Sequence, residues 1–226
     1  MQLPANPFPE PHTVPGCVDS RTYGEKIRFI KAALVGHLLT VLAVAFCAVQ
    51  IHLPLTDSEL LVWLGVIFAA MTGVRLGMKT GVHESWFSFA LLMAAVPLLG
   101  QLGRDIHAAG YPVIILLGSA AFAGVYTLLA GRDFSFPGMV ACGSVALIPA
   151  LAILTRTDVL DPGSAPFAWI LGTAYLGYVA YDLAMILKRR KVDEIPSAIA
   201  DFYRDSLNFL TYPFRVARHW QTYEFH

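Results

Sequence analysis

Polar and acidic residues recur at helical spacing in the last quarter of the chain, where their neighbours are strongly apolar. One set, spaced by three and four residues, comprises Tyr175, Tyr178 and Asp182. A second set, spaced by four, three and four residues, comprises Asp201, Asp205, Asn208 and Tyr212. Residues at this spacing lie on one face of an α-helix. Each set therefore predicts a helix with a single polar stripe, whose carboxylates are candidates for binding a proton or a cation.

The elements that must position these groups are predicted to be membrane helices. Of 226 residues, 56% are hydrophobic and only 14% are charged, whereas soluble domains carry roughly 25% charged residues. Apolar stretches near the length that a bilayer requires predict six spans, at about 30–53, 59–78, 84–103, 111–130, 136–154 and 166–187. A seventh candidate, 196–214, carries the second stripe and begins with proline, which suits the first turn of a helix. The expected fold class is an all-α polytopic membrane protein with seven transmembrane helices.

The domain organisation follows from the same pattern. Residues 1–26 form a Pro-rich N-terminal tail, 27–218 the transmembrane domain and 219–226 a C-terminal tail. A net charge of zero argues against a nucleic-acid partner. We find no CxxC, no HExxH, no glycine-rich phosphate loop and no nucleophile–base pair in the sequence. We therefore expect neither an enzyme nor a bound cofactor.

Lysine and arginine residues concentrate on one side of the predicted spans. Only Arg104 and Arg156 fall in the connections on the other side. The eleven on the basic side are Arg21, Lys26, Arg28, Lys31, Arg75, Lys79, Arg132 and the four residues of the "KRRK" loop at 188–191. Because cytoplasmic loops carry an excess of Lys and Arg, the N-terminus and this loop are predicted to face the cytoplasm or its equivalent.

Asp182 and Asp205 are the two carboxylates that we predict to meet. Asp182 precedes Lys188 by six residues, about 9 Å inside its helix, and Asp205 follows Pro196 by nine, roughly 13 Å along an antiparallel helix. Two adjacent carboxylates at membrane depth share one proton, and its loss favours a divalent cation. The alternative is that each carboxylate only bonds a neighbouring Arg, Tyr or backbone group and fixes helix packing.

Two other ionisable residues within the predicted spans have structural roles in this interpretation. His37, in the first span, is predicted to form a hydrogen bond to a neighbouring helix. Glu84, beside His83 at the start of the third span, is predicted to lie at the membrane interface.

One long segment also resembles a known family. The stretch "GYVAYDLAMILKRRKVDEIPSAIADFYRDSLNFLTYPFRV", residues 177–216, is similar to the C-terminal signature of the Bax inhibitor motif family, the transmembrane Bax inhibitor motif (TMBIM) proteins. The matching elements are Tyr181-Asp182, the mixed-charge loop from Lys188 to Glu194, Pro196, Tyr203-Arg204-Asp205, Asn208-Phe209 and Arg215. The five preceding spans match the family only in number and length.

This resemblance implies a seven-helix fold in which the seventh helix is central and is wrapped by the other six. It also implies a pH-sensitive calcium leak channel, in which paired aspartates act as the proton sensor and as transient Ca²⁺ ligands. The pair that carries over is Asp182 and Asp205, and Arg75 is the candidate for an arginine that bonds the pair. The supporting polar stripe comprises Asp201, Asn208, Tyr175, Tyr178 and Tyr212.

Two functions from different classes are therefore expected. The first is a pH-sensitive, calcium-permeable leak channel or cation/proton exchanger, whose partners are the lipid bilayer, Ca²⁺ and H⁺. The second is an accessory or structural subunit of a larger membrane complex that keeps the fold without the transport. The Pro-rich tail and the ending "HWQTYEFH" favour partner subunits. The expected location is the bacterial or the mitochondrial inner membrane rather than the endoplasmic reticulum.

Overall fold

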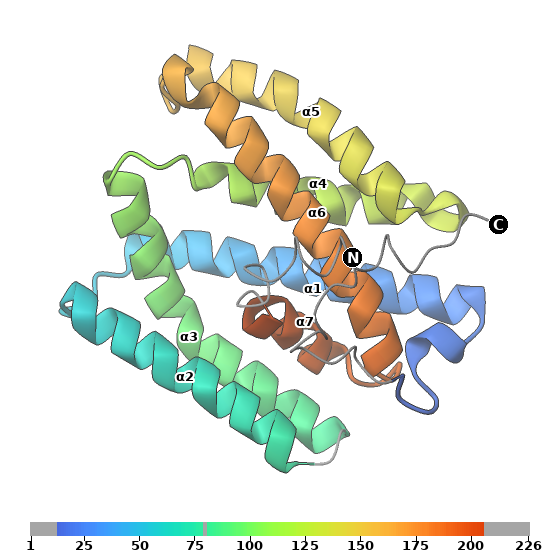
Figure 1. Cartoon of the computed structure of the whole chain (residues 1–226). Helices are drawn as coiled ribbons and strands as arrows, with labels where there is room; N and C mark the ends of the chain where they lie inside the picture. Colours follow the sequence, from blue (N-terminus) through green and yellow to red (C-terminus); the bar gives the residue numbers. More distant parts are fainter. Residues whose placement is uncertain (1–12, 79–80, 206–226) are drawn as a thin grey trace, which may run out of the picture.

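The computed structural model describes residues 13–78 and 81–205, and within these ranges every regular element is a helix. Figure 1 shows the arrangement of the seven α-helices. In chain order they are α1 (Tyr23–Gln50), α2 (Asp57–Gly77), α3 (Val82–Ala108), α4 (Ile114–Ala130), α5 (Phe136–Arg156), α6 (Ala165–Arg189) and α7 (Ile195–Arg204). Three short 3-10 helices are η1 (Val18–Ser20), η2 (Gly131–Asp133) and η3 (Pro162–Ser164). The predicted all-helical class is confirmed for these residues.

Five of the described helices are long and apolar enough to cross a membrane, namely α1, α2, α3, α5 and α6. The sixth apolar helix, α4, is shorter. Large apolar side chains such as Phe46, Leu129 and Ile170 are exposed on the outside of the bundle, as a lipid-facing surface requires. The protein is therefore a polytopic membrane protein. The described part of the predicted seventh span ends at residue 205, and residues 206–214 of that span lie outside the described residues.

The start of α2 illustrates how the local sequence determines a helix boundary. The Thr56 backbone N–H donates to Glu59 Oε2 at 2.8 Å, and the Glu59 N–H donates to Thr56 Oγ1 at 3.4 Å. This reciprocal pair is a capping box, which satisfies two backbone donors that the helix itself leaves without acceptors.

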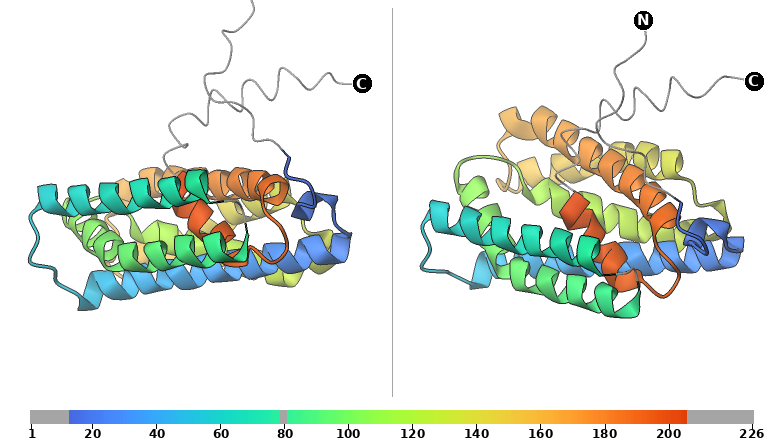
Figure 2. Two further views of the ribbon diagram at one scale, coloured as in Figure 1. Left: turned by 90° about the horizontal axis from the view of Figure 1, so that it is seen from below. Right: turned by 60° about the horizontal axis from the view of Figure 1, so that its bottom comes forward.

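The described part of α7 lies inside the bundle. It packs against α1, α2, α3 and α6, and in the right view of Figure 2 it lies between α2 and α3 on one side and α6 on the other. Ala198 and Ala200 are fully buried, and Phe202 is almost so. Four helices thus surround α7, which includes the start of the segment that was predicted to be central.

Apolar packing divides into one large cluster and two smaller ones. The large cluster joins α1, α4, α5, α6 and α7 through residues such as Leu34, Ile115 and Leu176. A second cluster joins α2 to α3, and a third brings Met71 and Leu92 of those helices against α7. The start of α7 therefore connects the α2–α3 pair with the rest of the bundle.

The segment before α1 packs against the end of α6. The Val14 N–H donates to Lys188 O at 3.0 Å, and the Val18 N–H donates to Arg190 O at 2.8 Å. Val18 and Cys17 are almost completely buried there. Because the last carbonyls of a helix lack N–H donors within the helix, these bonds stabilise the end of α6. The first helix begins at Tyr23, within the stretch that the sequence assigned to the tail.

Helix α3 contains Pro97 and bends along its length (Figure 1). Proline removes a backbone donor and is a common cause of such bends. Beyond it, Gly100 faces α1, where an added Cβ would lie 2.7 Å from Cys47 Cβ and 2.9 Å from Val44 O. The absence of a side chain at Gly100 therefore allows the backbones of α1 and α3 to approach closely.

Candidate functional site: a buried charged junction of α3, α6 and α7

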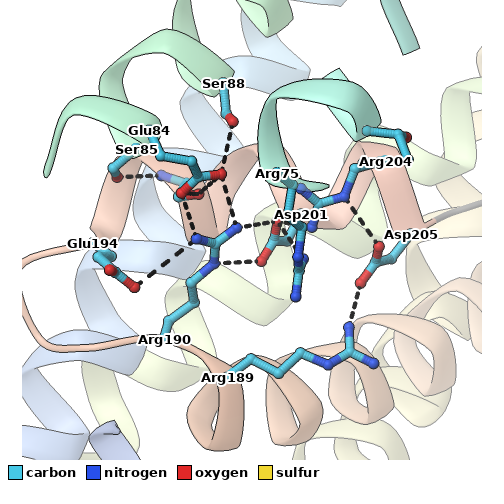
Figure 3. A network of polar contacts seen from close by, with 12 residues as sticks. Arg75, Glu84, Ser85, Ser88, Arg189, Arg190, Glu194, Asp201, Arg204 and Asp205 are labelled. Carbon is cyan, nitrogen blue, oxygen red and sulfur yellow. Dashed lines mark hydrogen bonds and ion pairs between the residues drawn. The ribbon is translucent and has the colours of Figure 1, made fainter. Parts of the chain in front are cut away.

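Arg190 lies at the centre of a charged junction, directly after the last residue of α6 (Figure 3). Its side chain is 0% exposed. Its Nε and Nη2 donate to the two oxygens of Asp201 at 2.8 and 2.9 Å, and its Nη1 donates to Glu84 Oε2 at 2.7 Å. The planar guanidinium matches a carboxylate in this two-point geometry. One side chain thus ties the end of α6 to the start of α3 and to α7.

Glu84 is held by hydroxyl groups as well as by Arg190. Ser88 Oγ donates to Glu84 Oε1 at 3.0 Å, and Ser197 Oγ donates to Glu84 Oε2 at 3.0 Å. The Ser197 N–H also donates to Ser85 Oγ at 2.9 Å. The prediction treated Glu84 as an interfacial residue and missed this role. The signal in the sequence was the serine spacing of one and four residues after the glutamate.

Asp201 is surrounded by arginines from three parts of the chain. Besides Arg190, it accepts hydrogen bonds from Arg204 on its own helix and from Arg75 at the end of α2, whose Nη1 lies 3.3 Å from Asp201 Oδ1. The side chain of Asp201 is 0% exposed. The sequence predicted Arg75 beside the pair of Asp182 and Asp205, and the structure brings it into a bond with Asp201.

Asp205 directly follows the last residue of α7 and is bound by two arginines. Arg189 Nη1 donates to Asp205 Oδ2 at 2.7 Å, and Arg204 Nε lies 3.4 Å from Asp205 Oδ1. Asp205 is 7% exposed. Because Arg189 belongs to α6, this ion pair is a second link between α6 and α7 (Figure 3).

Asp182 differs from the other carboxylates of the junction. It lies on α6, two helical turns before Arg189, and is 4% exposed. Its Oδ2 has no hydrogen-bond partner among the described residues. Asp205 and Asp201 both act on it electrostatically. The two predicted sensor residues therefore lie within electrostatic reach of each other, while a proton shared between them stays a prediction.

An aromatic layer lies beside these carboxylates. The Tyr178 hydroxyl donates to Phe202 O at 2.7 Å and so links α6 to α7. The Tyr175 hydroxyl and His37 Nε2 form a hydrogen bond at 2.5 Å, which links α6 to α1. The His37 ring also packs on Phe202 at a centroid distance of 4.6 Å. The interhelical hydrogen bond predicted for His37 is confirmed, and the stripe on α6 faces α1 and α7.

The sequence did not predict that Arg190 is buried. It was counted among the basic loop residues that determine orientation, because a run of four basic residues is usually solvated. Nothing in the run distinguishes it from Lys188, Arg189 or Lys191. The remaining predicted stripe residues, Asn208 and Tyr212, lie outside the described residues.

The pKa values of two groups in the loop between α6 and α7 are both raised, for different physical reasons. Burial by itself lowers the pKa of Arg190, but Asp201 and Glu84 outweigh burial and raise that pKa above its usual range. Burial raises the pKa of the Glu194 carboxyl, even though the Lys191 N–H donates to Oε2 at 3.1 Å. Arg190 therefore remains charged, and Glu194 takes up a proton more readily than an exposed glutamate.

The charges of the junction do not form a conventional metal site. Among the described residues, no three His, Cys, Asp or Glu side chains come together in a group that could hold a metal ion. Asp182 and Asp205, the predicted Ca²⁺ ligands, would supply carboxylate oxygens only. Ca²⁺ takes six to eight oxygen ligands in tight sites, so these two residues suit a transient contact with the ion.

Comparison with known proteins finds sequence similarity to a plant protein. The chain is similar to the BI1-like protein of Arabidopsis thaliana, with 26% identity over 117 residues. The match covers 51% of this chain and 46% of that protein, so the chain spans about half the length of the curated relative that it matches. No family model and no solved structure matches the chain. This similarity suggests a Bax inhibitor-like membrane protein, in agreement with the resemblance of residues 177–216.

Proposed function

We propose that this protein is a pH-sensitive, calcium-permeable leak channel or cation/proton exchanger, with Asp182 and Asp205 as its proton sensor. The observation that carries the proposal is the uneven distribution of arginines. Arginines bind both Asp201 and Asp205, whereas Asp182 is buried and its Oδ2 has no hydrogen-bond partner among the described residues. Ionisable groups in such a position within a membrane commonly mark a proton or ion pathway.

The proposed cycle depends on the charge of Asp182. When this carboxyl holds a proton, it can donate a hydrogen bond to a neighbouring carboxylate, and α6 and α7 are held together. When the proton leaves, Asp182 and Asp205 repel each other, and a divalent cation between them restores the balance of charge. The ion pair between Arg189 and Asp205 keeps the two helices linked during this change.

The electrostatics of the site support a sensor made of more than one group. Asp182 is influenced by Asp205 and Asp201 and, in the opposite sense, by Arg189 and Arg75. Interacting carboxylates titrate as a unit, so the pH response would belong to the pair rather than to either residue. The proposed substrates are Ca²⁺ and H⁺, and the proposed location is the bacterial or the mitochondrial inner membrane.

The test is calcium flux into liposomes that contain the purified full chain, measured across a range of pH. We expect flux in the wild type that changes with pH, and loss of this dependence in Asp182→Asn, because an amide does not titrate. The matched control is Asp133→Asn, which makes the same chemical change at an exposed carboxylate in η2. Wild-type liposomes that admit no calcium at any pH would contradict the proposal.

A second candidate function is an accessory subunit of a larger membrane complex. The observation in its favour is that Glu84, Asp201 and Asp205 are all neutralised by arginines, as expected in a static network that only joins helices. Purification in mild detergent from the native membrane separates the two functions. A stoichiometric complex combined with no flux from the isolated chain would favour the subunit.

A further inference from the structure

Arg190 is held at both its backbone and its side chain. Its backbone N–H donates to Ile186 O at 2.9 Å, and its carbonyl accepts from Val18 N at 2.8 Å. Its guanidinium is completely buried between Glu84 and Asp201. A buried guanidinium is costly unless its charge and its donors are satisfied, and here two carboxylates satisfy them. The position of Arg190 is therefore determined from several directions.

The bonds of Arg190 determine where the first turns of α7 lie. Through Glu84, which also accepts from Ser197 Oγ, Arg190 is connected to the first turn of α7. Through Asp201, one turn later, it is connected directly. Asp205 follows after one more turn and meets Arg189 of α6. A helix that is attached at two successive turns cannot rotate or slide, so these bonds place Asp205 on the side of α6.

Arg190 also determines the state of Asp201. It binds both oxygens of that carboxylate, whereas Arg75 and Arg204 each bond Oδ1 alone. Asp201 acts electrostatically on Asp182. Without Arg190, Asp201 would keep arginine contacts at Oδ1 only, and its less neutralised carboxylate, close to the proposed sensor, would compete for the same proton.

We propose that Arg190 is a positioning residue, which holds the start of α7 on α3 and α6 and keeps Asp201 out of the proton sensor. The first role of Arg190, holding the start of α7, concerns helix packing and does not depend on the proposed function. The second part rests on the proposed function, because it assigns the pH response to Asp182 and Asp205 alone.

The other ionisable groups around the site decide the direction of the expected effect. Those on α2, α3, α6, α7 and the connecting loop are Arg75, Glu84, Tyr178, Asp182, Arg189, Glu194, Arg204 and Asp205, and α1 contributes His37. With Arg190 and Asp201 included, four arginines face five carboxylates. Removing one arginine increases the excess of negative charge, which favours binding of a proton. The midpoint of the pH response should therefore move to higher pH.

The first experiment uses Cys17 as a reporter of packing. Its thiol is free and almost completely buried, in the segment that Val18 attaches to the Arg190 carbonyl. The full chain in detergent micelles is treated with a hydrophilic maleimide, and modification of the Cys17 peptide is followed by mass spectrometry. We expect labelling at least about fivefold faster in Arg190→Gln than in the wild type, because the loop opens locally more often.

Two variants control this labelling experiment. Lys191→Gln removes a positive charge one residue later, and it should leave the labelling rate unchanged. Arg190→Lys keeps the charge but loses the two-point geometry, and it should give an intermediate rate. If Arg190→Gln does not fold, the lysine variant carries the test. A wild-type labelling rate in every variant that folds would overturn the first part of the inference.

The second experiment measures the pH midpoint of calcium flux in liposomes. Arg190→Gln should shift the midpoint upward by about one pH unit, since Asp201 loses the arginine that binds both of its oxygens. The double variant Arg190→Gln/Asp201→Asn should return to the wild-type midpoint, because no carboxylate remains at this position. A purely structural role for Arg190 would not be rescued in this way. An unshifted single variant or an unrestored double variant would overturn the second part.

The two experiments separate failure of this inference from failure of the proposed function. If the wild type shows no flux at any pH, the proposed function fails, together with the assignment of the pH response. The Cys17 labelling rates then still decide whether Arg190 positions α7.

Discussion

The two ends of α3 are held in the bundle by different interactions. At its start, Glu84 and Ser85 bind Arg190 and Ser197 in a buried set of ion pairs and hydrogen bonds. In its second half, α3 packs on α1 at Gly100, where an added Cβ would lie within 3 Å of three atoms of α1. One end depends on charges, and the other depends on close contact between backbones.

This difference between the two ends of α3 indicates where the bundle can respond to pH. Lipid tails are as apolar as leucine, so helices in a membrane associate through close packing or through polar bonds. The atoms that meet at Gly100 are Cys47 Cβ and backbone atoms of Val44 and Ala48, and none of these atoms is ionisable, so this contact should not respond to pH. The charged junction contains several such groups, and a change in one of them alters the bonds of its neighbours. The proposed sensor lies at the junction for this reason.

The largest effect is expected from breaking the charged junction. Arg190→Gln leaves Glu84 and Asp201 buried without their main partner, which should lower the free energy of unfolding by about 3–5 kcal/mol. Denaturant unfolding in detergent, followed by circular dichroism, measures this change. Lys191→Gln is the control, and a loss below about 1 kcal/mol for Arg190→Gln would mean that the junction does not hold α3.

A smaller effect is expected from disturbing the close-packed end. Gly100→Ala forces α1 and α3 apart, because the new methyl group would meet backbone atoms of Val44 and Ala48. The expected loss is about 1–3 kcal/mol. Gly103→Ala lies in the same helix, and no atom lies within 4 Å of its added Cβ. If both alanines behave alike in the same unfolding measurement, α1 and α3 do not depend on this contact.

The two losses should also differ in their dependence on pH. In Arg190→Gln, the buried carboxylates of Glu84 and Asp201 lose their main cationic partner, and protonation then becomes favourable, so the folded state binds more protons than the unfolded state. Stability of this variant should therefore rise as pH falls, and the loss should shrink by about 1–2 kcal/mol between about pH 8 and about pH 5. The loss in Gly100→Ala should stay constant over the same range. Parallel pH profiles for the two variants would remove the distinction between the ends of α3.

The smallest effect is expected at an uncharged polar contact between helices. Tyr175→Phe removes the hydrogen bond to His37 Nε2 and should cost about 0.5–1.5 kcal/mol. Tyr111→Phe removes a hydroxyl from an exposed tyrosine and should be neutral. A loss for Tyr175→Phe as large as that of Arg190→Gln would show that one neutral hydrogen bond stabilises the bundle as much as the charged junction does.

The local sequence determines most of the helices. The predicted spans 136–154 and 166–187 correspond to Phe136–Arg156 and Ala165–Arg189. The first helix shows the largest difference, since it was predicted from residue 30 and begins at Tyr23. Its first turns carry charged residues, and hydropathy does not detect them although they are helical. The length and periodicity of apolar stretches are local properties of the sequence, so they predict helices without knowledge of the tertiary structure.

The sequence also predicted that each polar set shares one face of its helix. Tyr175, Tyr178 and Asp182 lie on one face of α6 because their spacing repeats with the helical turn, and the structure turns this face toward α1 and α7. The spacing of Asp201 and Asp205 likewise places both on one side of α7, where arginines bind them.

Only the tertiary structure decided which charge binds which. The four basic residues at 188–191 are equivalent in the local sequence, yet Arg190 alone is completely buried among them. Its partner Glu84 lies 106 residues earlier in the chain, and the Arg75 that reaches Asp201 lies 126 residues before it. The sequence by itself determined a polytopic bundle of apolar helices with carboxylates near the basic end. The pairing of those carboxylates depends on how α2, α3, α6 and α7 meet, because an ion pair forms between side chains that are close in space, whatever their separation along the chain.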